Sequence, residues 1–389
     1  MALPALGMAQ TSIANSGGDN NETGLIEEVF KIKEKQDKFH LYLNTQANFN
    51  MNWDGENGDE FQGGKFGFRQ LRLEFKGRIN DWLTYRYRQR LTQNKFGDFD
   101  NIMKSIDIAE VGFQVDKVNI VAGKQCTAYG GIEFDLNPIE VYQYCDMIDY
   151  MDNFMTGVRA AWDINPAQQL QFQILNSTAL NPGDMYGTNF EKAKLPLLYT
   201  ANWNGSFGQD FFKTRWSASI MNEIKNKHMY YLAFGNQFNF SPQCGAWLDV
   251  MYSREGIDRK GIITNVVGTQ NGHNAFNTEY LTLLLHANYF FHPKWNVFAK
   301  VAWERNGVYK ESKPTGGSLG VEKGNYGTDW LYVGGVEYYP LKDRGLHFFL
   351  TYIGQNTRHS EMAQKMYSAV PSSFTNRLTC GFIWQVPIF

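Results

Sequence analysis

The sequence of 389 residues contains no uncharged apolar run long enough to form a membrane-spanning helix. A chain of this kind can cross a bilayer only as a closed β-barrel, because each backbone N–H and C=O group then has a partner away from water. The chain also has no large excess of charge of one sign, since it contains 37 Lys and Arg and 39 Asp and Glu. We expect no nucleic-acid partner.

Cysteine is scarce, with four residues at positions 126, 145, 244 and 380 and no close pair of the kind that binds zinc. Cys126 and Cys145 share one expected loop, where two free thiols are favoured over a disulfide. The seven histidines show no metal-ligand spacing, and Ser177 and Ser219 have no nearby base in the sequence. These absences argue against an enzyme, a metal site and any other cofactor.

Aromatic residues and glycine are abundant. Phe, Tyr and Trp make up 15% of the chain beside 37 Gly, as expected where strands carry interfacial aromatic girdles and turns need glycine. The clearest strand is 39–53, in which Phe49, Met51 and Trp53 alternate with Asn48, Asn50 and Asn52. This two-residue period persists for the length of a tilted membrane strand.

The same alternation predicts about sixteen strands, the even number that bacterial barrels use. After the first strand they are expected near 70–79, 83–91, 105–115, 117–124, 154–164, 168–176, 195–207, 211–222, 228–240, 243–254, 277–291, 295–306, 329–339, 346–357 and 373–389. We therefore predict an all-β fold, a transmembrane antiparallel β-barrel over 39–389 whose outer surface contacts membrane lipid.

The connections fall into two classes that alternate along the chain. Short turns, often with proline, are expected at 80–81, 116, 165–166, 208–210, 241–242, 292–293 and 340–345, and longer polar loops at 54–64, 92–103, 125–153, 177–194, 223–227, 255–276, 307–328 and 358–372. Outer-membrane barrels have short periplasmic turns and longer external loops. The alternation thus places all long loops on one side of the membrane.

The N-terminal residues precede the barrel. Residues 1–9, MALPALGMA, are typical of the end of a secretory signal peptide, and an ordinary disordered N-terminus is the alternative. Residues 10–38 are predicted to form a periplasmic segment, in which 25–38 is either one short amphipathic helix or a charged linker.

The stretch 125–153 interrupts the alternation and fits neither a strand nor a helix period. After Lys124 it contains no Lys or Arg, and it carries a group of carboxylates, Glu133, Asp135, Glu140, Asp146, Asp149 and Asp152. We predict that this third long loop folds into the barrel and narrows its lumen.

Basic residues occupy the inward face of the neighbouring strands. They are Arg72, Lys76, Arg78, Arg86, Arg88 and Arg90, with Lys213 and Arg215 further along the chain. A guanidinium group stays charged and offers a planar fork to carboxylate or phosphate. We predict a basic wall that faces the acidic loop. The alternative, that these cations only neutralise Glu74, Glu110 or the loop carboxylates, stays open and can hold at the same time.

The segment Val121 to Gln125, followed by Tyr129-Gly130-Gly131-Ile132-Glu133, resembles the strand end and start of the constricting third loop in the phosphate-selective porin O and P family. The resemblance implies a sixteen-stranded trimeric porin of the bacterial outer membrane with an arginine ladder, which Arg72, Arg78, Arg86, Arg88 and Arg90 match in kind. The slightly acidic chain and the acidic loop argue against selectivity for phosphate.

We therefore expect a water-filled channel for passive diffusion of small hydrophilic solutes, with a mild preference for anions. A selective phosphate or polyphosphate channel is the alternative. A non-conducting surface-binding barrel or an outer-membrane enzyme, with loops 255–276 and 307–328 as its binding surface, is a further one.

Overall fold

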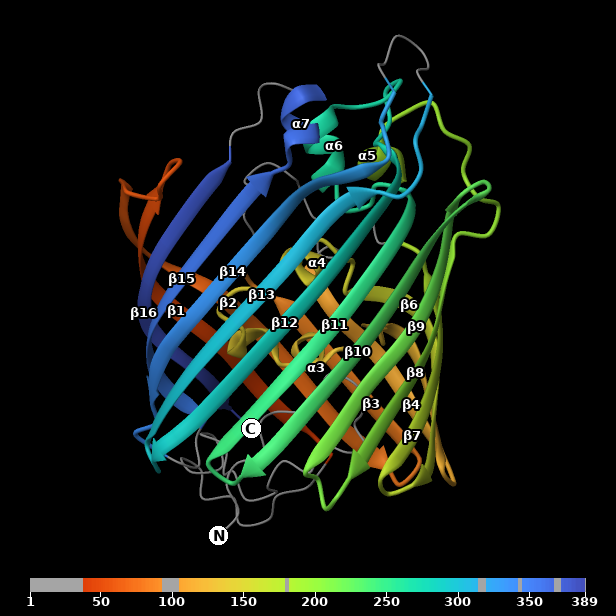
Figure 1. Cartoon of the computed structure of the whole chain (residues 1–389). Helices are drawn as coiled ribbons and strands as arrows, with labels where there is room; N and C mark the ends of the chain where they lie inside the picture. Colours follow the sequence, from red (N-terminus) through yellow and green to blue (C-terminus); the bar gives the residue numbers. More distant parts are fainter. Residues whose placement is uncertain are drawn as a thin grey trace.

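The computed structural model describes residues 38–92, 105–178, 182–313, 320–341, 345–366 and 372–388. Within these ranges the chain forms one closed barrel of sixteen antiparallel strands, and the first strand completes the ring by pairing with the last (Figure 1). The predicted fold class and strand number are confirmed. Residues 1–9, and all of the predicted N-terminal segment except Lys38, lie outside the described residues.

The strands run from 8 to 21 residues. They are β1 His40–Asp54, β2 Glu60–Asn80, β3 Leu83–Arg90, β4 Ile106–Val115, β5 Val118–Cys126, β6 Phe154–Asn165, β7 Gln168–Asn176, β8 Leu197–Phe207, β9 Phe212–Ile224, β10 Lys227–Ser241, β11 Cys244–Ile257, β12 Phe276–His292, β13 Trp295–Val308, β14 Gly324–Tyr338, β15 Leu346–His359 and β16 Ser373–Pro387.

Helical structure among the described residues is confined to short turns in the connections. They are α3 Ile132–Asp135, the 3-10 turn η2 Pro138–Glu140, α4 Asp146–Asp149, α5 Pro182–Tyr186, α6 Ile262–Val267 and α7 Glu361–Met366. None of these helices is long and apolar enough to span a bilayer.

The two faces of each strand follow the alternation in the sequence. In β4, for example, Val111, Phe113 and Val115 are exposed on the outside, whereas Glu110 is buried on the inside. Near the short turns the outer surface carries aromatic rings, including the stacked pairs Trp82–Phe113 and Phe207–Phe212. This pattern suits a barrel with lipid outside and polar groups inside.

The loops are not separated by length as strictly as the sequence predicts. The loop expected at 54–64 spans only 55–59, because β2 already begins at Glu60 after a turn in which Gly55 and Gly58 have positive φ. The loop expected at 223–227 is a two-residue turn, in which Asn226 adopts a left-handed conformation. The expectation of long loops throughout one end is therefore wrong at these two connections.

The inner wall has two chemically different parts. From β8 to β15 many inward side chains are apolar and belong to one buried cluster, among them Leu198, Tyr231, Trp247, Leu284 and Phe298. From β1 to β7 the buried inward side chains are largely polar or charged, with Asn44, Arg72, Arg88 and Gln171 as examples. This division decides where the chain between β5 and β6 packs.

Candidate functional site

The chain between β5 and β6, residues 127–153, lies against the apolar part of the inner wall, and we call it the inward segment. Its buried side chains Phe134, Tyr142, Met147 and Ile148 belong to the same cluster as the wall residues from β8 to β15. Figure 1 shows α3 and α4 within the barrel outline. Burial of several large apolar side chains, worth about 1.5–3 kcal/mol each, favours this position.

A wall carboxylate caps the first helical turn of the inward segment. Asp249 of β11 accepts hydrogen bonds from the backbone N–H groups of Ile132 at 2.8 Å and Glu133 at 2.9 Å. The residue that precedes α3, Gly131, has no side chain to cap the turn and has a φ of 87°. The free N–H groups at a helix start need acceptors, and here the barrel supplies them.

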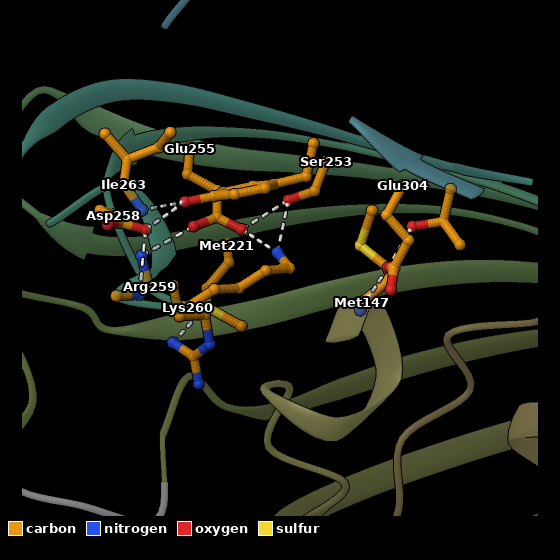
Figure 2. Close-up of polar contacts among 12 residues, drawn as sticks. Met147, Met221, Ser253, Glu255, Asp258, Arg259, Lys260, Ile263 and Glu304 are labelled. Carbon is orange, nitrogen blue, oxygen red and sulfur yellow. Dashed lines mark hydrogen bonds and ion pairs between the residues drawn. The ribbon is translucent and has the colours of Figure 1, made fainter. Parts of the chain in front are cut away.

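A second wall carboxylate caps α4 in the same way. Glu304 of β13 accepts hydrogen bonds from the backbone N–H groups of Asp146 at 2.8 Å and Met147 at 3.0 Å, and Figure 2 shows Glu304 beside Met147. Thr282 of β12 donates to the same carboxylate at 2.8 Å. The inward segment is therefore held at two points by contacts that do not depend on its own side chains, because both use backbone donors.

Further buried polar contacts tie the inward segment to the same side of the barrel. Lys300 of β13 forms an ion pair with Glu133 at 2.8 Å and donates to the backbone carbonyl of Gln143. The Tyr142 hydroxyl donates to Glu337 of β14 at 2.7 Å. Removing one partner from such a buried pair is costly, because the other is left without compensation.

The predicted loop carboxylates are distributed among several partners. Glu133 pairs with Lys300, Asp135 lies 3.2 Å from Arg215 of β9, and Asp152 lies 2.7 Å from Arg259. Glu140 lies 4.0 Å from His347 of β15. Asp146 accepts from Gln355 at 3.4 Å. Of these partners, Arg215 belongs to the predicted basic wall, whereas Lys300 and Arg259 do not.

The pKa values of two acids of the inward segment are raised above their ordinary values. Burial raises the pKa of Asp135 to about 6, although the positive charges of Arg215 and Arg159 oppose this shift. Burial also raises the pKa of Asp149, and the nearby charge of Arg69 opposes it. Arg69 and Arg159 therefore face the inward segment.

The predicted basic wall pairs largely with carboxylates of its own strands. Asp107 of β4 lies 3.2 Å from Arg72, 3.6 Å from Arg88 and 2.9 Å from Arg90. Arg86 pairs with Glu74 at 2.8 Å, in agreement with the neutralising role left open for Glu74. The other predicted members lie toward the short turns, where Arg78 is exposed, Lys76 lies over the Tyr42 ring and Lys213 lies 3.4 Å from Asp210.

Two of the charged residues that the sequence reading missed lie at β-bulges. The register between β1 and β2 shifts at Arg69, and that between β3 and β4 shifts at Asp107. A bulge adds one residue to a strand and re-aims its side chain, so strict alternation assigns such residues to the wrong face. Arg159, Asp249, Lys300 and Glu304 needed no bulge, because each is a charge at an inward position of a predicted strand.

We define the arginine wall by six arginines of β2, β3 and β6 and by the three carboxylates beside them. The arginines are Arg69, Arg72, Arg86, Arg88, Arg90 and Arg159, and the carboxylates are Glu74, Asp107 and Glu110. Six positive charges against three negative charges leave this surface with a formal charge of +3.

Outer loops are fastened to the end of the inward segment through Arg259. Its guanidinium donates to Asp152 and Glu223, both at 2.7 Å, and to the Ser177 carbonyl at 3.1 Å. The adjacent Lys260 pairs with Glu255, as Figure 2 shows. These contacts join the connection after β11 to β7, β9 and the inward segment.

The cysteines do not take part in this fastening. Cys126 and Cys145 are both buried, and they are not joined in a disulfide. The expectation that these two thiols stay unjoined agrees with this. Among the described residues, no group of His, Cys, Asp and Glu has the arrangement of a metal site.

A family model described as phosphate-selective porin O and P matches residues 39–385. The chain belongs to this family. The porin is thus a channel of the bacterial outer membrane, and its family points to a channel rather than an enzyme. No curated protein sequence matches the chain.

Solved structures of other outer-membrane proteins resemble this porin in fold. The outer membrane channel DcaP of Acinetobacter baumannii has 11% identity and a TM-score of 0.54, over 88% of this chain and 96% of that chain. An anion-selective porin from Comamonas acidovorans has 8% identity and a TM-score of 0.55, over 90% and 99%. OmpT of Vibrio cholerae in its trimer form has 10% identity and a TM-score of 0.55, over 90% and 100%. At these identities the likeness concerns the fold alone.

Proposed function

We propose that this porin passes small hydrophilic solutes by passive diffusion with a preference for anions. The observation that carries this proposal is the formal charge of +3 on the arginine wall. Charges in a narrow passage between low-dielectric walls are less screened than in bulk water, so an excess of one sign raises the local concentration of counter-ions. Solutes still leave, because no tight site is required for such filtering.

The inward segment is the constriction in this proposal. Its backbone and side chains are attached to β11, β13 and β14, and Arg69 and Arg159 of the arginine wall lie near its carboxylates. Several of its carboxylates are already paired with Lys300, Arg215 or Arg259. Such pairing reduces the repulsion that the acidic segment exerts on anions.

Single-channel recording in planar bilayers tests the proposal. With a KCl gradient across the membrane, the reversal potential is expected to have the sign that shows chloride to be more permeant than potassium. A barrel that does not conduct, or one that prefers potassium, contradicts the proposal. Addition of inorganic phosphate to the same bilayer distinguishes a general anion channel from a phosphate channel, which phosphate would block.

We further propose that three copies associate in the membrane. The support is the resemblance in fold to OmpT, whose structure was determined in a trimer form. The mass of the detergent-solubilised porin, measured by light scattering with the detergent contribution subtracted, tests this. A mass of one chain contradicts it.

The anion preference is expected to rise as the pH falls through about 6. The raised pKa of Asp135 means that its carboxyl is charged at pH 7.5 and largely neutral at pH 5, so acidification removes a negative charge beside Arg215. Reversal potentials in a KCl gradient at both pH values measure the effect. The variant Asp135→Asn is the control, and an unchanged pH dependence in this variant contradicts the assignment.

A further inference from the structure

Three arginines point outward from the barrel at the end that carries α6 and α7. Arg254 belongs to β11, Arg305 to β13 and Arg358 to β15, and all three side chains are exposed. Figure 1 shows β11 to β15 side by side, with their upper ends at the connections that contain α6 and α7. In contrast to the arginine wall, these side chains are open to whatever surrounds the barrel.

The strand register places a threonine between two of these arginines. Arg305 lies opposite Thr328 of β14, and Thr328 lies opposite Arg358. Neighbouring strands are about 4.8 Å apart, so the Cα atoms of the two arginines are about 10 Å apart. Two long side chains can converge over this distance on one anionic group. The Thr328 hydroxyl between them can donate a further hydrogen bond to the same group.

The three arginines have donors that the chain does not use. The Arg254 guanidinium carbon lies 3.9 Å from the centre of the Tyr309 ring, and this stacking leaves the N–H groups at the edge of the guanidinium plane available. Arg358 donates from Nε to Asn356 at 3.3 Å. Within the described ranges none of the three forms an ion pair, and Arg305 forms no hydrogen bond. The remaining N–H groups are suited to a partner from outside the chain.

One acid lies beside these arginines. Glu279 of β12 is opposite Arg254 in the register, and it accepts a hydrogen bond from the Tyr252 hydroxyl at 3.1 Å. We call Glu279, Thr328 and the three arginines the outer basic patch. Three positive charges and one negative charge give this patch a formal charge of +2.

Aromatic side chains indicate the depth of the outer basic patch in the membrane. Trp303 precedes Arg305 by two residues on β13, and it lies opposite Trp330 of β14, whose ring stacks on Tyr332. Trp and Tyr side chains favour the level of the lipid headgroups. Two residues of a strand add about 6–7 Å, so Arg305 lies just beyond this level, at the charged groups of the headgroups.

A second copy of the chain is poorly suited to cover this patch. Such a copy would have to present acids, yet every acid in β4 to β15 except Asp163 and Glu279 is buried. Asp163 lies beside the short turn at the opposite end of the barrel, where it accepts a hydrogen bond from Gln169. Phosphate groups, in contrast, match the planar fork of donors that guanidinium offers.

We propose that the outer basic patch binds the phosphate groups of a lipid in the outer leaflet of the membrane. The longer loops, which share its end of the barrel, are external in outer-membrane barrels. Arg305 and Arg358 bind one phosphate with Thr328 between them, and Arg254 adds attraction from β11. The acyl chains then lie along the exposed apolar side chains of β12 to β15. This inference concerns the outside of the barrel and goes beyond the proposed anion preference.

The test measures how strongly the intact porin retains lipid A, a glycolipid that carries phosphate groups and acyl chains. Native mass spectrometry counts the bound lipid while lipid A, or lipid A without its phosphates, is titrated into the detergent-solubilised porin. Half-saturation is expected at a concentration at least about tenfold lower for lipid A, the factor that one hydrogen bond to a charged group supplies. Equal retention of the two lipids overturns the proposal. Release of lipid A by an equal concentration of inorganic phosphate also overturns it, because the site would then be one for the free ion.

The triple variant Arg254→Gln, Arg305→Gln and Arg358→Gln is expected to lose the preference for lipid A over its dephosphorylated form. The single variant Arg305→Gln removes no ion pair or hydrogen bond with the described residues, so it should fold like the wild type and lose part of the preference. Heat-modifiable migration in gel electrophoresis checks that each variant forms a barrel. A full preference in both variants overturns the proposal.

The matched control removes three cations at or near the short turns of the opposite end, and it should keep the preference. The control changes are Arg78→Gln, Lys117→Gln and Lys294→Gln. An equal loss of the preference in this control overturns the assignment to the outer basic patch. A triple arginine variant that retains lipid A but no longer forms the assembly of the wild type also overturns it, because the patch would then be a contact between copies.

The reversal potential separates this inference from the proposed function. The triple variant of the outer basic patch should have the wild-type reversal potential, because its three arginines lie outside the barrel. A changed reversal potential places them on the path of the ions and overturns the lipid assignment. A wild-type porin that prefers potassium contradicts the proposed function and leaves the lipid site intact.

Discussion

Replacing Asp249 and Glu304 together by alanine is expected to release the inward segment and to raise the single-channel conductance. The two carboxylates accept four backbone N–H groups at the starts of α3 and α4. A buried donor left without an acceptor costs about 1–3 kcal/mol, so the double variant loses several kcal/mol of attachment. Single-channel recording measures the conductance and its noise.

The conservative variants Asp249→Asn and Glu304→Gln serve as controls for this experiment. Each amide retains one oxygen that can accept a hydrogen bond, so their conductance should lie between those of the wild type and the double alanine variant. Heat-modifiable migration in gel electrophoresis checks that every variant forms a barrel. An alanine variant that folds and conducts like the wild type contradicts the attachment through these carboxylates.

Replacing Arg72, Arg88 and Arg90 by glutamine is expected to abolish the anion preference. These three arginines share Asp107 as a counter-ion, and their removal lowers the arginine wall from six positive charges to three, against three carboxylates. The formal charge of the wall thus falls from +3 to 0. The reversal potential in a KCl gradient should move toward that of potassium.

Arg78→Gln is the matched control for the arginine variant. Arg78 lies on β2 with Arg72, but its side chain is exposed near the turn to β3. Because water screens an exposed charge, this change should move the reversal potential much less than the triple variant. A triple variant with the wild-type reversal potential contradicts a role for the arginine wall in selectivity.

The barrel was predictable because each strand repeats one simple pattern. Strands such as β7 and β13 begin where the alternation predicts, at Gln168 and Trp295. The largest boundary error is in β2, which starts ten residues before the expected position, at Glu60 rather than at residue 70. The glycines and the bulge at Arg69 interrupt the two-residue period there. The alternation is therefore not visible in the sequence of this part of β2, although it still pairs with β1.

The partners of the inward segment could not be predicted from the sequence. Its acidic composition was visible, but the residues that hold it in place belong to strands more than a hundred positions away. Asp249 and Glu304 accept hydrogen bonds from backbone N–H groups. Nearly every residue has such a group, so the side chains of the inward segment do not indicate these partners. Four of the six arginines in the arginine wall were predicted, because Arg72, Arg86, Arg88 and Arg90 lie on the adjacent strands β2 and β3. Arg69 and Asp107 were missed because each lies at a bulge.

The capping of α3 and α4 by later strands has a consequence for the order of assembly. Residues 132–149 leave the ribosome before β11 and β13, yet their backbone donors find their acceptors 116 to 158 residues further along the chain. Contacts so distant in sequence form late, because the intervening chain must first be ordered. The inward segment therefore reaches its final position only after most of the ring has been built.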